Sequence, residues 1–434
     1  MIETSGRHDR RNSLLNIAEG GSYIAGASLI SAITVIPALI TRLGGGNVII
    51  GALSVIVWVG LFLPQVFASR YGQTLPWKKP WVIKYGLIQR LVIFVIGTII
   101  LLLGDSNNEI TLVIFLIFFA LNHVLMGVAT PVWFDLYAKL TPITKRGRLT
   151  GVRNSVSGGL AFIGGLFLTW LLGTFMFPLN YAIAFFAAFV LQLISLILQT
   201  QLVEEYQSSV VPQQSLGDYL TELSKMLRAN SAFRAFLTAS VFLVLGSLPL
   251  SFFTVYALHT FGATGSDVGT FTLVMVTGQI VGGLMNGFIA DRYGNKLALV
   301  ISGTGALVAC IGAIIAPSLL PFHAVFFFAG MNLGSALLTR YNLAIEFGPI
   351  AQRSTYLGLM NTTLAPVYFA GLLGGWIVDQ FGYSVIFVLG VIGSTTSILL
   401  MIFFVDDPRL LRARSSAIRT SHGNISPEEK LASS

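Results

Sequence analysis

Ionisable and amide side chains lie inside several long apolar stretches of this chain. They are Glu19, Tyr23, Arg90, Asn122, His123, Gln279, Asn332 and Arg340. Burying such groups in an apolar segment is costly, so they are candidates for binding a solute or an ion. Glu19 is a carboxylate that could take up a proton, and a histidine such as His123 titrates near neutral pH. The chemistry that these residues support is reversible binding of a proton or a small solute.

Structural explanations compete with this interpretation. Pairing between Glu19 and Arg90 would make both residues structural, and Glu19 could also reach the lipid headgroups. Arg340 could balance Glu346, and His123 could donate to a backbone carbonyl. The amide side chains could bond across neighbouring helices. We expect His123 and Arg340 to be the strongest functional candidates.

Apolar segments of about 20 residues must position these groups, since each can cross a bilayer as a helix. Hydrophobic residues make up 54% of the chain and charged residues 10%, whereas a soluble domain carries about a quarter charged residues. We predict spans at 17–40, 47–69, 81–103, 110–138, 149–172, 179–201, 234–258, 266–290, 297–316, 322–345, 356–378 and 383–404. The sequence therefore predicts an all-α polytopic membrane protein with twelve transmembrane helices.

The basic residues fall almost entirely on one side of these spans. Of 26 lysines and arginines, 22 lie in the connections of one side or at the span ends next to them, three lie within spans, and Arg42 alone lies in the opposite connections. Cytoplasmic connections are enriched in Lys and Arg. The pattern predicts a multi-pass plasma-membrane protein with both termini in the cytoplasm. It also explains the net charge of +8 without a nucleic-acid partner.

Two internal repeats divide the chain into similar halves. Residues 65–75, after the second span, resemble 287–297, after the eighth, and residues 136–154 resemble 343–361. A parallel duplication of six spans is typical of transporters. We predict a six-helix bundle over 1–201, a cytoplasmic linker over 202–232, a second bundle over 233–404 and a cytoplasmic tail over 405–434.

This organisation, together with one short motif, resembles the major facilitator superfamily. The turn after the eighth span reads Gly287-x-x-x-Asp291-Arg292-x-Gly294-x-Lys296, which is similar to the signature turn of that family. The first half departs from the pattern, because Ser69 stands where the aspartate would be.

The resemblance implies two pseudo-symmetric six-helix bundles with a central cavity lined by spans one, four, seven and ten. The residues that it places in the cavity, as substrate or proton candidates, are Glu19, Tyr23, Asn122, His123, Asn332 and Arg340. It also implies a gating contact, in which Asp291 caps the fifth span and pairs with Arg148 or Arg153. Gly294 would permit the tight bend, Gly287 would allow close helix approach, and Arg90 is a candidate for a structural charge pair.

We therefore predict a monomeric secondary active transporter that moves a small solute, such as a drug-like or other amphipathic compound, by alternating access with proton coupling. Uptake and efflux both stay open. No phosphate-binding Gly-rich turn and no metal-ligand cluster occurs in the sequence, so neither a cofactor nor a metal is expected. The alternatives are a transporter-like sensor or scaffold, and a polytopic membrane enzyme. Clustered acidic residues would favour the enzyme, but Asp135, Asp291 and Glu346 are scattered singly.

Overall fold

The structure is a computed structural model that describes residues 6–141, 145–208, 217, 225–228, 230–348 and 353–408. Much of the predicted linker and nearly all of the predicted tail lie outside these ranges. The domain boundaries at 201, 232 and 404 therefore stay predictions.

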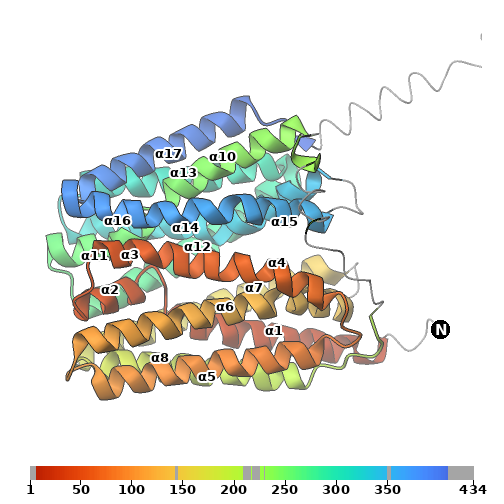
Figure 1. Cartoon of the computed structure of the whole chain (residues 1–434), viewed down its shortest axis with the longest axis horizontal. Helices are drawn as coiled ribbons and strands as arrows, with labels where there is room; N and C mark the ends of the chain where they lie inside the picture. Colours follow the sequence, from red (N-terminus) through yellow and green to blue (C-terminus); the bar gives the residue numbers. More distant parts are fainter. Residues whose placement is uncertain are drawn as a thin grey trace, which may run out of the picture.

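Within the described ranges the chain is helical, without strands, and forms two bundles. The first bundle contains α1 (Gly6–Leu29), α2 (Val35–Arg42), α3 (Asn47–Ser54), the π-helical turn η1 (Val55–Val59), α4 (Gly60–Gly72), α5 (Lys79–Leu103), α6 (Asn108–Leu140), α7 (Arg146–Thr174) and α8 (Leu179–Thr200). The second contains α10 (Ser231–Ser247), α11 (Leu250–Phe261), α12 (Gly265–Tyr293), α13 (Asn295–Ile315), α14 (Leu319–Glu346), α15 (Arg353–Leu364), the 3-10 turn η4 (Ala365–Phe369), α16 (Ala370–Phe381) and α17 (Tyr383–Phe403). Figure 1 shows the bundles as two layers of roughly parallel helices.

Eleven helical stretches in the described part of the chain are long and apolar enough to cross a membrane. The first predicted span is not among them. The chain breaks between α1 and α2, which leaves α1 with a largely polar first half and α2 with 8 residues. The prediction of one continuous helix over 17–40 is therefore wrong. The break follows from local chemistry, since Ser31 Oγ accepts hydrogen bonds from the backbone N–H groups of Ile33 and Thr34 and so competes with helix formation.

A side chain of the second bundle donates a hydrogen bond to a free backbone carbonyl at this break. Pro37 has no N–H and cannot bond the carbonyl of Ile33, four residues earlier. Thr254 Oγ1, from α11, donates to that carbonyl at 2.9 Å. In an apolar bundle, side chains from neighbouring helices commonly satisfy backbone groups that proline leaves free. The broken first span thereby becomes a contact between the bundles.

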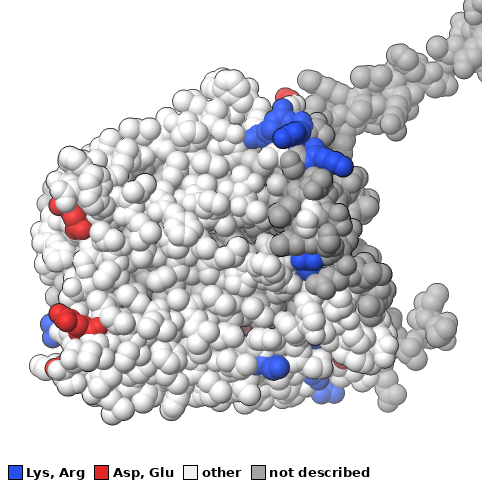
Figure 2. All heavy atoms as spheres, in the orientation of Figure 1, with Lys and Arg blue, Asp and Glu red and all other residues white. Residues whose placement is uncertain are grey.

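Charge distinguishes the two ends of the molecule. Figure 2 shows most of the visible Lys and Arg at the end that carries the N-terminus, and Asp and Glu at the opposite end. We call the first, which includes Lys79 and Lys296, the basic end. The second, which includes Asp105 and Asp379, is the acidic end.

Polar contacts join the bundles from the acidic end to mid-helix. Asn47 Nδ2 donates to Asp379 Oδ1 at 2.7 Å, and the hydroxyl of Tyr383 donates to Asn47 Oδ1 at 2.9 Å. Deeper in the protein, the hydroxyls of Thr34 and Thr272 lie 2.6 Å apart. The acidic end is therefore closed in this conformation.

Glycines let the helix backbones meet along this acidic-end seam, where α3 packs on α16. A Cβ on Gly51 would collide with the carbonyl of Gly371, and a Cβ on Gly375 would collide with that of Asn47. Small residues at helix interfaces in membrane proteins allow this kind of close backbone approach. Toward the basic end, by contrast, a Cβ added at Gly287 of α12 would meet no atom within 4 Å. The same holds for Gly159, an exposed position near the middle of α7.

Substituting Gly51 by alanine should force the acidic end open. Overpacking against backbone costs about 1–3 kcal/mol, which corresponds to roughly a tenfold shift between closed and open forms. The measurement is the rate at which an impermeant maleimide alkylates Thr272→Cys in a Cys310→Ser background, since Thr272 is buried and Cys310 is the natural cysteine. We expect a rate about tenfold higher. Gly159→Ala is the matched control, and equal rates in the two variants would contradict the closed seam.

Candidate functional site

A buried carboxylate, Glu19, is the centre of a polar network inside the first bundle. Glu19 lies on α1 and is 3% exposed. Its Oε1 accepts hydrogen bonds from Gln199 Nε2 at 2.7 Å and Ser195 Oγ at 3.2 Å. Its Oε2 accepts from Arg153 Nη2 at 3.2 Å. One cation and two neutral donors from α7 and α8 thus satisfy a carboxylate among apolar helices.

Arg153 reaches Glu19 because the next residue on α1 is a glycine. A Cβ on Gly20 would occupy the position of the Arg153 guanidinium. The same guanidinium lies 4.9 Å from the ring centroid of Trp133, and its Nε donates to the Asn16 carbonyl at 3.3 Å. Arg153 is therefore directed into its own bundle.

A second buried cation, Arg90 of α5, joins the network indirectly. Its Nε donates to the Gln192 carbonyl at 3.0 Å, and its Nη2 donates to Ser195 Oγ at 3.5 Å. Ser195 in turn donates to Glu19. The direct ion pair between Glu19 and Arg90, one of the two structural alternatives for Glu19, is not formed, because the Ser195 hydroxyl lies between them. Arg90 is nevertheless held by structural contacts.

Tyr23 and Asn122 extend the network toward the middle of the bundle. The Tyr23 ring centroid lies 5.4 Å from the Arg90 guanidinium, and its hydroxyl donates to Met126 Sδ at 3.3 Å. Asn122 Oδ1 accepts from Gln89 Nε2 at 2.9 Å. The structure thus places three of the predicted residues, Glu19, Tyr23 and Asn122, in or beside one network.

His123 and Asn332 make the contacts of their structural alternatives. His123 is 8% exposed, and its Nδ1 lies 2.9 Å from the Phe119 carbonyl. Asn332 Nδ2 donates to the Ser302 carbonyl at 2.9 Å, and Ser302 Oγ donates to the Asn332 carbonyl at 3.1 Å. Asn332 therefore joins α13 to α14.

Arg340, on α14 in the second bundle, lacks a partner. It is 5% exposed, and no hydrogen bond or ion pair joins its guanidinium to a described residue. The proposed balance with Glu346 is absent, and Glu346 Oε1 instead accepts from Asn295 Nδ2 at 2.8 Å. A buried cation without a partner is energetically costly, so this site is suited to an anionic ligand.

The signature turn bends at Gly294 as predicted, but no neighbouring helix approaches it closely at Gly287. Gly294 has φ +99°, a conformation that favours glycine. Gly287 has no close neighbour in this conformation. Arg292 lies 5.4 Å from the ring centroid of Tyr293, and Lys296 Nζ donates to the Ile402 carbonyl at 3.1 Å.

The predicted ion pair between this turn and the fifth span is not formed in this conformation. Arg153 is bonded to Glu19, and both Asp291 and Arg148 are exposed to solvent. The physical reason is that Glu19 holds Arg153 within the first bundle, while a Cβ on Gly287, one turn before Asp291, would meet no atom within 4 Å. A latch formed in another conformation stays a prediction.

Sequence analysis missed the amide and hydroxyl groups that complete the network. Gln192, Ser195 and Gln199 lie on α8 with spacings of three and four residues, which places them on one helix face. A polar face of this kind within an apolar segment was the signal that could have revealed them.

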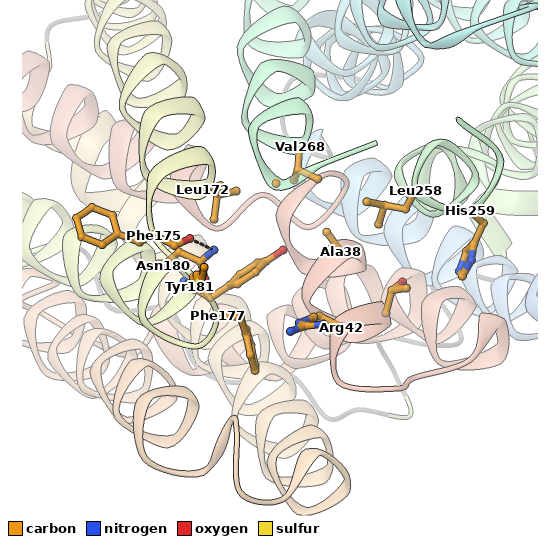
Figure 3. Close-up of a pocket in the computed structure, with 13 residues that line it drawn as sticks. Ala38, Arg42, Leu172, Phe175, Phe177, Asn180, Tyr181, Leu258, His259 and Val268 are labelled. Atoms are coloured by element: carbon orange, nitrogen blue, oxygen red, sulfur yellow. Dashed lines mark hydrogen bonds between the residues drawn. The ribbon is translucent and has the colours of Figure 1, made fainter. Parts of the chain in front are cut away.

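A separate pocket lies at the acidic end, between the two bundles. Figure 3 shows its lining, with α2, the loop after α7 and the start of α8 on one side and the facing ends of α11 and α12 on the other. Its volume is about 530 Å³. The candidate residues from sequence analysis do not line it.

Comparison with known proteins is consistent with this geometry. The sequence model of the Major Facilitator Superfamily matches residues 23–371 and also residues 235–429. The chain belongs to this family. Its fold is therefore that of the major facilitator superfamily transporters, as the sequence predicted.

Curated relatives are transporters of small solutes. A cis,cis-muconate transport protein of Acinetobacter baylyi is 32% identical over 142 residues, which cover 32% of this chain and 33% of the relative. The 4-hydroxybenzoate transporter PcaK of the same organism is 30% identical over 153 residues, covering 34% and 32%. The matched segment spans about a third of each relative's length.

Solved structures support the fold over nearly the whole chain. A D-xylose-proton symporter superposes with a TM-score of 0.68 at 14% identity, covering 91% of this chain and 98% of that one. The nucleoside transporter NupG gives a TM-score of 0.67 at 12% identity, covering 90% and 98%.

Removing Arg153 should destabilise the first bundle, because the buried Glu19 carboxylate would lose its positively charged partner. For Arg153→Gln we expect a loss of about 3 kcal/mol in unfolding free energy, the low end for a buried pair, measured as a lower Tm in detergent. Adding Glu19→Gln should restore most of it, because the uncompensated charge is then gone. Arg148→Gln, at an exposed position of the same helix, is the control. Equal losses for the two arginine variants would contradict the network.

Proposed function

We propose that this protein is a secondary active transporter that moves a small organic anion by alternating access, coupled to protons. The observation that supports it best is the closed seam at the acidic end, combined with the exposed position of Gly287 and Asp291 near the basic end of α12. Two bundles that close at one end at a time give a central site alternate access to the two sides of a membrane.

The orientation that we propose places the basic end in the cytoplasm of a cell whose plasma membrane holds the protein. Lys and Arg are enriched in cytoplasmic connections, and they gather at this end. The conformation described is then closed to the outside and faces inward.

The proposed substrate class rests on Arg340 and on the relatives. A buried guanidinium without a partner gains most from a carboxylate, which can accept two parallel hydrogen bonds from it. The names of three relatives refer to muconate, 4-hydroxybenzoate and niacin. We infer that the substrate is a small carboxylate with an apolar or aromatic body.

Glu19 is the proposed proton-binding group. Protonation would remove the negative charge that holds Arg153 and would release that guanidinium from its own bundle. The freed Arg153 could then take part in the contact with Asp291 that the signature turn predicts. Proton binding would in this way be coupled to closure of the basic end.

The Glu19→Gln variant should lose solute accumulation driven by a pH gradient and keep solute exchange. An amide cannot carry the proton, so uptake driven by a pH gradient into proteoliposomes should be lost, while exchange of labelled for unlabelled solute continues. The exposed Glu109→Gln is the matched control. Normal pH-driven accumulation in Glu19→Gln would remove this residue from the coupling role.

The Arg340→Gln variant should lose anion transport. Truncating one partner of a buried charge pair costs about 2–5 kcal/mol, so we expect a decrease of at least tenfold in exchange rate. The assay uses reconstituted protein with cis,cis-muconate, 4-hydroxybenzoate, niacin and the neutral myo-inositol as solutes. Arg11→Gln, at an exposed position of the basic end, is the control. Unchanged anion exchange would contradict the assignment, and binding without any exchange would favour a sensor.

A further inference from the structure

The pocket at the acidic end is lined by both bundles and is mostly apolar. Its apolar wall includes Ala38 of α2, Leu172 of α7, Leu258 of α11 and Val268 of α12. All except the half-buried Leu258 are at most 5% exposed. A volume of about 530 Å³ lies within the range of sites for small molecules, which are typically apolar with a few placed polar groups.

Tyr181 supplies an unpartnered polar group inside this pocket. It is 7% exposed, and its hydroxyl makes no hydrogen bond with a described residue. Figure 3 shows the ring extending from α8 into the space between α2 and α12. Because the hydroxyl faces the pocket and bonds no described residue, it is available to donate to a ligand.

Arg42 supplies a cation at the rim of the same pocket. Its guanidinium lies 5.3 Å from the ring centroid of Phe177, and it forms no ion pair with a described residue. It is the one lysine or arginine among the described residues of the acidic end. In an end that otherwise carries carboxylates, this is the position at which an anion would be attracted.

We propose that this pocket is a second, peripheral site that binds a small carboxylate with an apolar or aromatic body. The carboxylate pairs with Arg42 and accepts a hydrogen bond from the Tyr181 hydroxyl, while the apolar body contacts the wall contributed by both bundles. This pocket at the acidic end is distinct from the site of Arg340, which lies near the basic end of α14.

Binding here acts as a clamp on the acidic end. The wall is complete only while α2 and α8 face α11 and α12, so a ligand that contacts both bundles binds the closed form more tightly and increases its population. The binding step is independent of transport. The clamp deepens the proposed function, because it would make an external carboxylate slow the transport cycle.

The first experiment measures benzoate binding to the purified protein by calorimetry, with neutral benzamide as the isosteric control. The Arg340→Gln background removes the proposed central site. We expect this background to bind benzoate and not benzamide. Adding Arg42→Gln should weaken binding at least fivefold, since hydrogen bonds to charged groups contribute strongly, and Tyr181→Phe should weaken it about threefold. Arg11→Gln should change nothing.

Two outcomes would overturn the site. One is the absence of benzoate binding to the Arg340→Gln variant. The other is a benzoate affinity of the Arg42→Gln, Arg340→Gln double variant that stays within fivefold of the affinity of the Arg340→Gln variant. Neither outcome depends on whether the protein transports any solute, so failure of this proposal is distinguishable from failure of the proposed function.

The second experiment tests the clamp by alkylation of Thr272→Cys in the Cys310→Ser background. Benzoate should slow labelling by an impermeant maleimide, and Arg42→Gln should abolish the effect. Bound benzoate that leaves the labelling rate unchanged would overturn the clamp.

Discussion

Inside an apolar bundle, a polar group is costly unless it has a hydrogen-bond partner, and this constraint explains the main features of the structure. The carbonyl that Pro37 leaves free is bonded by Thr254 from the other bundle. The carboxylate of Glu19 is bonded by three side chains from two helices. These partners cost little where helices already pack closely, and they fix which helices must be neighbours.

The two bundles satisfy the constraint differently, although they derive from similar sequences. In the first bundle the ionised groups Glu19, Arg90 and Arg153 are linked by direct contacts or through Ser195. In the second, Arg340 has no such partner among the described residues. A self-contained network favours a proton-responsive element, whereas an unpartnered cation favours ligand binding. In the proposed function, the duplication would therefore support two chemical roles on one architecture.

Glycine determines how closely the bundles can approach. At the acidic end, Gly51 and Gly375 allow backbone contact between α3 and α16. Such contacts are strong but short in range, so a small rotation of one bundle breaks them all together. A seam of this kind is suited to a two-state change between closed and open forms.

The sequence by itself determined the all-helical membrane fold, its division into two halves and the basic end, because hydropathy and charge act through composition and need no partner. It also identified Glu19 and Arg340 as buried ionisable groups. Only the tertiary structure decided that Arg153 bonds Glu19 and not Asp291. It also decided that Ser195 and Gln199 donate to Glu19, and that Tyr181 extends into the pocket at the acidic end. Such choices depend on which helix faces lie within about 3 Å of each other, and helix packing, unlike hydropathy, is a property of the whole chain.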